Sequence, residues 1–119
     1  MSENKIKGDF GEESANSFLR KKNVIILEKN FRTRSGEIDI IGLFNNTIIF
    51  YEVKTRKSDI YGSPAEAVTR SKINKIKLTS KFYMAKFNLY NYDVRYDVIE
   101  VYLNKNLKLE KINIIENAF

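Results

Sequence analysis

The sequence predicts a single α/β domain built around one mixed β-sheet, and three observations carry that prediction. The chain has 119 residues, the length of one ordinary domain. Its apolar fraction of 43% is that of a globular protein with one core. The hydrophobic spacing along the chain runs from helix-like to strand-like, then back to helix-like and finally to strand-like. That order is typical of an α/β fold.

The first helix is expected over residues 10–22. Apolar and small side chains recur there at helical spacing and give the helix one face for the core: Phe10, Ser14, Ala15, Phe18 and Leu19. Asp9 is a candidate N-cap, with Glu12 three residues later as its capping-box partner. Asn23 is a candidate C-cap.

Strands and a second helix follow this first helix. The strands are expected at residues 24–27, 37–44, 47–55, 93–103 and 107–115. A basic connection is expected at residues 29–35, a loop at 58–64 and a lysine-rich helix at 65–87. Asn45 and Asn46 tolerate positive φ, so they fit a two-residue hairpin turn.

The sequence contains no cysteine and no histidine. This excludes disulfides, thiol nucleophiles and zinc sites of the Cys/His kind. A general base must then be Asp, Glu, Lys, Tyr or a metal-bound water. Any bound metal would be held mainly by oxygen, which favours magnesium, manganese or calcium.

The charge and the apolar runs indicate the environment. The formal net charge of +6 suits a polyanionic partner, nucleic acid first. No apolar run is long enough to span a bilayer, and the N-terminal residues have no hydrophobic segment of the signal-peptide kind. We therefore expect a cytoplasmic protein without a membrane partner.

The predicted hairpin brings charged residues together. Counting back from a turn at Asn45-Asn46, Asp39 faces Glu52 and Glu37 faces Lys54. All four share one face, because side chains alternate along a strand. Directly opposed residues have Cβ atoms roughly 4.5–5.5 Å apart.

Two carboxylates at that separation repel each other, and apolar surroundings make their charges costlier still. A divalent cation at Asp39 and Glu52 would offset this repulsion. It would also neutralise a scissile phosphate and lower the pKa of a bound water. Lys54 could orient that water or stabilise the charge growing on the phosphorane. The structural alternative is a Glu37–Lys54 salt bridge on an exposed sheet face, and spacing alone does not separate the two.

These residues resemble the PD-(D/E)XK nuclease pattern, with Gly36-Glu37-Ile38-Asp39 followed by Glu52-Val53-Lys54. Ile38 stands where the pattern has proline. Over nearly its full length the chain is similar to the YraN family, an uncharacterised family of predicted endonucleases. Further matching stretches are Gly8-Asp9-Phe10-Gly11-Glu12 with Ala15, Asn30-Phe31-Arg32, Phe50-Tyr51, Thr55-Arg56, Gly62, Pro64, Lys72 and Arg95-Tyr96-Asp97-Val98.

The resemblance implies a restriction-endonuclease-like fold, a central mixed sheet flanked by helices, related to archaeal Holliday junction resolvases. It implies Asp39 and Glu52 as ligands of Mg²⁺ or Mn²⁺, and Lys54 as the catalytic lysine. Glu12 matches the position at which resolvases carry a further acidic ligand. Its alternative role is helix capping.

Basic residues surround the motif. We expect Arg32, Arg34, Arg56 and Lys72 to contact phosphates, which gives affinity without sequence information. Most lysines of the second helix are expected on a solvated face. Its core side is expected to carry Ile73, Ile76, Tyr83 and Met84.

The function expected first is metal-dependent hydrolysis of DNA, on branched or damaged substrates. A nucleic-acid-binding module of the same fold that cleaves nothing is the alternative, and a scaffold protein is a third. Asp39, Glu52 and Lys54 favour the first, because pure binding does not need paired carboxylates facing a phosphate. A homodimer is attractive by analogy with resolvases, which cut two strands symmetrically.

Overall fold

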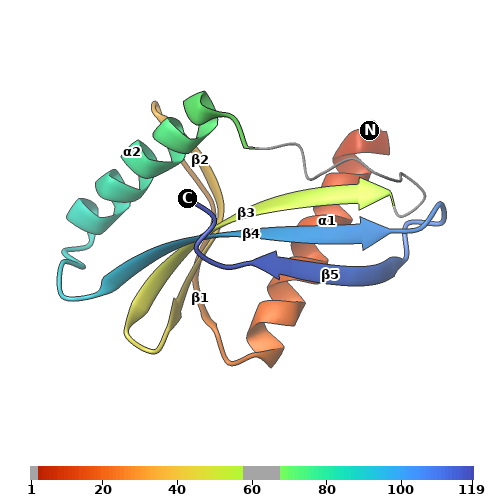
Figure 1. The fold of residues 1–119 in the computed structure, drawn as a ribbon, viewed down its shortest axis with the longest axis horizontal. Coiled ribbons are helices and arrows are strands. Elements are labelled where there is room, and N and C mark those ends of the chain that lie inside the picture. The colour runs from red at the N-terminus through yellow and green to blue at the C-terminus, as the bar shows by residue number, and fades with distance from the viewer. Residues whose placement is uncertain (1–2, 58–67) are drawn as a thin grey trace.

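The computed structural model describes residues 3–57 and 68–119, which form helices on two sides of one sheet (Figure 1). In chain order the elements are α1 (Glu3–Lys21), β1 (Ile25–Thr33), β2 (Gly36–Phe44), β3 (Thr47–Lys57), α2 (Arg70–Lys86), β4 (Asp93–Leu103) and β5 (Leu109–Ile115). Neither of these helices is long and apolar enough to cross a membrane.

The five strands form one sheet in the order β1-β2-β3-β4-β5. β1 to β3 are joined antiparallel, β3 and β4 run parallel, and β5 returns antiparallel to β4. The parallel pair needs a crossover, and α2 lies within it. The predicted α/β fold with one mixed sheet is therefore confirmed, and the arrangement is consistent with a restriction-endonuclease-like fold.

Each helix covers one face of the sheet. Ala15 and Leu19 of α1 pack with Ile49 of β3, whereas Ile76 of α2 packs with Ile48 on the opposite face. Neighbouring strand residues point to opposite faces, so a single strand supplies both cores. Figure 1 shows the two helices on opposite sides of the strands.

Helix α1 differs from the prediction at its start and agrees at its end. It begins at Glu3, and Asp9 lies inside it with its Oδ2 3.6 Å from Lys5 Nζ, so the predicted N-cap role of Asp9 is wrong. An ion pair between residues four apart supports this added helix. Phe10, expected on the core face, is 49% exposed. Asn23 has φ 67°, the left-handed conformation of a C-cap residue, as expected.

Strand β1 extends through most of the segment predicted as a basic connection. Phe31 pairs with Ile38, and the ladder continues to Thr33 and Gly36. Cross-strand pairing with β2 thus outweighs the weak apolar pattern. The strand is irregular, with a register shift between Ile26 and Glu28.

The Asn45-Asn46 turn is confirmed, with φ of 48° and 62°. Positive φ at both central residues fits a tight hairpin turn, whose backbone twist matches that of the two strands it connects. Helix α2 begins at Arg70, so residues 68 and 69 of the predicted helix lie outside it, and Thr69 Oγ1 caps it by accepting from Lys72 N at 3.2 Å. The predicted loop at 58–64 and helix residues 65–67 lie outside the described residues.

The remaining expectations for α2 and the last strand hold with small changes. Ile76, Tyr83 and Met84 are buried on the core side of α2 as predicted, whereas Ile73 is half-buried. Strand β4 has the predicted bounds. Strand β5 begins at Leu109, because Leu107 has φ 60° and belongs to the turn.

Candidate active site

The backbone ladder between β2 and β3 ends just before the carboxylates. Its last pair is Ile40 with Tyr51, so the predicted pairing of Asp39 with Glu52 is not formed. Instead, Val53 N donates to Asp39 Oδ2 at 2.7 Å. The Asp39 side chain thus takes the place of a backbone acceptor where the two strands separate.

Glu37 also departs from the prediction. It pairs with Arg32 of β1, and Arg32 Nε lies 3.3 Å from Glu37 Oε1. The expected pairing of Glu37 with Lys54 is therefore wrong, and so is the structural alternative that rested on it. The physical reason is that the part of β2 before Ile40 pairs with β1 and no longer with β3.

Asn30 of β1 joins α1 to this hairpin. It has φ 52° and is skipped in the ladder between the pairs Lys29–Ile40 and Phe31–Ile38. With its NH2 group turned to the carboxylates, the amide nitrogen donates to Glu12 Oε1 at 2.8 Å and to Glu37 Oε1 at 3.3 Å. Asparagine tolerates this left-handed backbone better than most residues.

Asp39 is the most perturbed acid of the site. Burial first, and then the nearby Glu52 charge, raise the pKa of Asp39 to about 7. The hydrogen bond from Val53 N opposes that rise. Near neutral pH, without a cation beside it, this carboxyl is therefore partly protonated.

Glu52 is 5% exposed, and two lysines reach the same oxygen of its carboxylate. Lys72 Nζ lies 2.6 Å from Glu52 Oε1, and Lys54 Nζ lies 3.6 Å from that atom. Burial disfavours the charge of Lys72, but the hydrogen bond and charge of Glu52 outweigh it and raise the pKa of Lys72. Such pairing is what a buried carboxylate requires.

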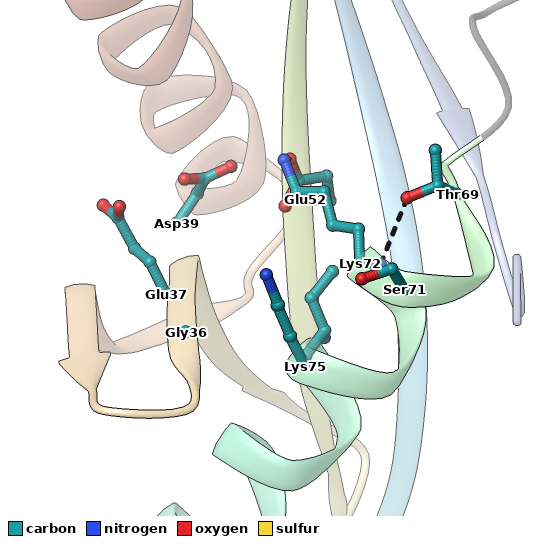
Figure 2. A pocket seen from close by; sticks show the side chains of 9 residues that line it. Gly36, Glu37, Asp39, Glu52, Thr69, Ser71, Lys72 and Lys75 are labelled. Atoms are coloured by element: carbon teal, nitrogen blue, oxygen red, sulfur yellow. Dashed lines mark hydrogen bonds and ion pairs between the residues drawn. The ribbon is translucent and has the colours of Figure 1, made fainter.

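A pocket of about 340 Å³ opens beside these residues. Figure 2 shows Glu37 and Asp39 on its strand side and Lys75 and Lys72 reaching in from α2. Its walls are thus acidic on one side and basic on the other. That combination can take a cation and an anionic phosphodiester side by side.

A second pocket, of about 230 Å³, lies against α1. Glu12, Asp9 and Glu13 line it, and Asp39 borders both pockets. Burial, followed by the charges of Glu37, Asp9 and Glu52, raises the pKa of Glu12. The first helix therefore brings Glu12 to the edge of the site, where a further ligand was expected.

The donor set fits a hard divalent cation. Within residues 3–57 and 68–119 no three acidic side chains converge as a metal cluster. Asp39 and Glu52 nevertheless offer carboxylate oxygens to one pocket. Magnesium is commonly held by one or two carboxylates, with waters and substrate phosphate completing its shell.

The four expected phosphate-binding residues are not equally close to this pocket. Lys72 lines it, and Arg32 reaches its edge through Glu37. Arg34 is exposed at the turn between β1 and β2. Arg56 lies near the end of β3, and its Nε and Nη2 are buried without a hydrogen-bond partner among the described residues.

Sequence reasoning did not single out Asn30 or Lys75 as site residues. Lys75 follows Lys72 by three positions, so helical spacing places both on one face and could have identified it. No such spacing in the sequence identifies Asn30, because its role depends on where α1 packs. Gly11 sets that position, because a Cβ there would overlap Thr55 Oγ1 of β3.

Comparison with known proteins matches residues 11–101 to the family described as "Uncharacterised protein family UPF0102". The chain is 50% identical over 116 residues to a UPF0102 protein of Caldanaerobacter subterraneus subsp. tengcongensis, with 97% of this chain and 95% of that protein covered. A UPF0102 protein of Clostridium novyi is 50% identical over 98% of this chain and 97% of its own length. One of Clostridium acetobutylicum is 48% identical, with 98% and 95% covered.

Proposed function

Since this chain belongs to the uncharacterised protein family UPF0102, we propose a function from its own side chains: metal-dependent hydrolysis of phosphodiester bonds in DNA. The observation that carries the proposal is the Asp39 and Glu52 pair in one pocket with lysines of α2. Placing two carboxylates together in poorly solvated surroundings is unfavourable for folding. A catalytic cation site is a reason to keep them. The proposal places the chain among the PD-(D/E)XK endonucleases.

Asp39 and Glu52 would hold Mg²⁺ or Mn²⁺, with Glu12 as the third carboxylate at the edge. Once bound, the cation would neutralise the scissile phosphate and lower the pKa of a coordinated water. The hydrogen bond from Val53 N fixes one oxygen of Asp39, so that this side chain keeps its orientation. Such preorganisation avoids reorganisation during the reaction.

The lysines supply the remaining charge. Lys54 lies beside Glu52, where its ammonium can stabilise negative charge that grows on the phosphate oxygens. Lys72 and Lys75 line the same pocket from α2 and would hold the nucleic-acid backbone. Backbone contacts of this kind read shape and charge rather than sequence. Such contacts suit branched or damaged DNA. A homodimer would present two such sites, one to each of two DNA strands.

The deciding experiment is a cleavage assay on single-stranded, duplex, flap and four-way-junction DNA, in magnesium, manganese or EDTA. We expect cleavage only with metal, and a loss of about a hundredfold or more in Glu52→Gln and Lys54→Met. Lys81→Met is the matched control, because it removes one charge from an exposed position of α2. Equal activity of wild type and Glu52→Gln would contradict the proposal.

One observation favours the non-catalytic alternative. Lys72 and Lys54 already pair with Glu52, so the buried carboxylate has counter-charges without any metal. A nucleic-acid-binding module of the same fold would bind the DNA panel in a salt-dependent manner and cleave none of it. Metal-independent binding, unchanged in Glu52→Gln, would support that module.

A further inference from the structure

Lys72 is placed where a cation would bind. Its Nζ lies 2.6 Å from Glu52 Oε1, in direct contact with the carboxylate assigned to the metal above. Lys54 Nζ, 3.6 Å from the same oxygen, is the weaker neighbour. Figure 2 shows the Lys72 chain extending from α2 across the pocket to Glu52. A metal ion at Glu52 must therefore share or replace the place of this ammonium.

Of the two lysines, Lys72 is the one free to leave. Lys54 lies on β3, inside the sheet, where it pairs with Glu100 of β4. Its side chain is 25% exposed. The Lys72 side chain is 44% exposed at the first turn of a helix. Thr69 caps that turn, so the long stem of Lys72 can move while its backbone stays fixed.

The charges of the site favour such a movement. Asp39 and Glu52 carry two negative charges when ionised, and Lys54 and Lys72 carry two positive ones. A divalent cation added to this set leaves an excess of two positive charges. An arriving phosphodiester carries one negative charge, and Lys72 lines the pocket that it would enter, so the displaced ammonium can pair with it.

We propose that Lys72 is an internal counterion of Glu52 that competes with the divalent cation and is displaced toward substrate phosphate when the cation binds. The inference rests on the proposed function, because it takes Glu52 as a metal ligand. It gives Lys72 a specific role at the metal site, beyond that of a surface lysine that contacts phosphate. It also couples metal binding to phosphate binding, because the ammonium that the cation displaces from Glu52 becomes available to the phosphate.

The test is a calorimetric titration of the full chain with Mn²⁺ in the absence of nucleic acid. Lys72→Met should tighten Mn²⁺ binding about tenfold, the size expected when one charge is removed from contact with the site. Lys72→Arg keeps the charge and should stay within about threefold of wild type. Lys75→Met removes an equal charge from the same pocket without the contact to Glu52, and should tighten binding by less than about threefold.

Several outcomes would overturn the inference. Unchanged or weaker binding in Lys72→Met excludes competition, and equal tightening in Lys75→Met reduces it to general electrostatics. Lys72→Gln repeats the test if the Met variant does not fold by circular dichroism. Binding that Glu52→Gln abolishes and Lys72→Met leaves unchanged would refute the role of Lys72 while the metal site stands. No Mn²⁺ binding in wild type or in Lys72→Met would refute both.

Discussion

Replacing Asp39 with asparagine tests the electrostatics of the site in the metal-free protein. The amide oxygen can still accept the hydrogen bond from Val53 N, so the variant removes the charge and keeps the contact. The folded-state pKa of about 7 lies above the ordinary aspartate value. A carboxyl whose pKa is raised in the folded state is destabilising at any pH at which the unfolded state has already lost the proton. Its cost grows as the pH rises from the ordinary aspartate value of 3.8 to about 7 and levels off above that.

The magnitude follows from the pKa. Each unit of difference between folded and unfolded states is worth about 1.4 kcal/mol. Between pH 5 and pH 8 this cost should grow by about 2–3 kcal/mol, because up to about pH 7 folded Asp39 keeps a proton that unfolded Asp39 has already lost. Asp39→Asn avoids this cost, so its advantage over wild type should widen by about that amount.

The assay is urea unfolding in EDTA at pH 5 and pH 8, with equal m-values as the test that the two proteins unfold alike. Asp93→Asn makes the same chemical change at an exposed position of β4 and serves as the control. An advantage of Asp39→Asn that does not grow with pH, or a variant less stable than wild type at pH 8, would refute this account of the site.

Three further predictions concern the contributions of single side chains to the free energy of unfolding. Gly11→Ala should lower the free energy of unfolding by about 1–3 kcal/mol, because its Cβ would overlap Thr55 Oγ1, and pairing it with Thr55→Ala should recover part of that loss in the same urea assay. Arg95→Met should cost about 3–5 kcal/mol, because Asp97 is 1% exposed and accepts from Arg95 at 2.9 and 3.0 Å. If adding Asp97→Asn fails to restore stability, the loss does not come from an unpaired charge. Phe50→Ala should lower stability by about 3–5 kcal/mol, since Phe50 is 1% exposed in the α2-side core; a loss below about 1 kcal/mol in thermal unfolding would contradict that packing.

Local rules recovered much of the fold. The Asn45-Asn46 turn and the pairs next to it followed from positive-φ tolerance and from counting back along the hairpin. The bounds of β4 followed from its alternating side chains. Errors began where partners were distant in sequence. Residues 29–33 have a weak apolar pattern and are a strand because β2 pairs with them.

The candidate site divides in the same way. Asp39, Glu52 and Lys54 could be named from the sequence, because a hairpin brings them near each other. Counting could not reveal that the residues of β2 before Ile40 do not pair with β3, so that the Asp39 side chain accepts from Val53 N.

The sequence by itself determined an α/β chain whose hairpin carries two carboxylates and a lysine, because turn chemistry and strand alternation act between near neighbours. Only the tertiary structure decided that Lys72 contacts Glu52 and that Asn30 links Glu12 to Glu37. Those contacts depend on where α1 and α2 pack against the sheet. That packing is set by burial summed over both faces, which no local pattern contains.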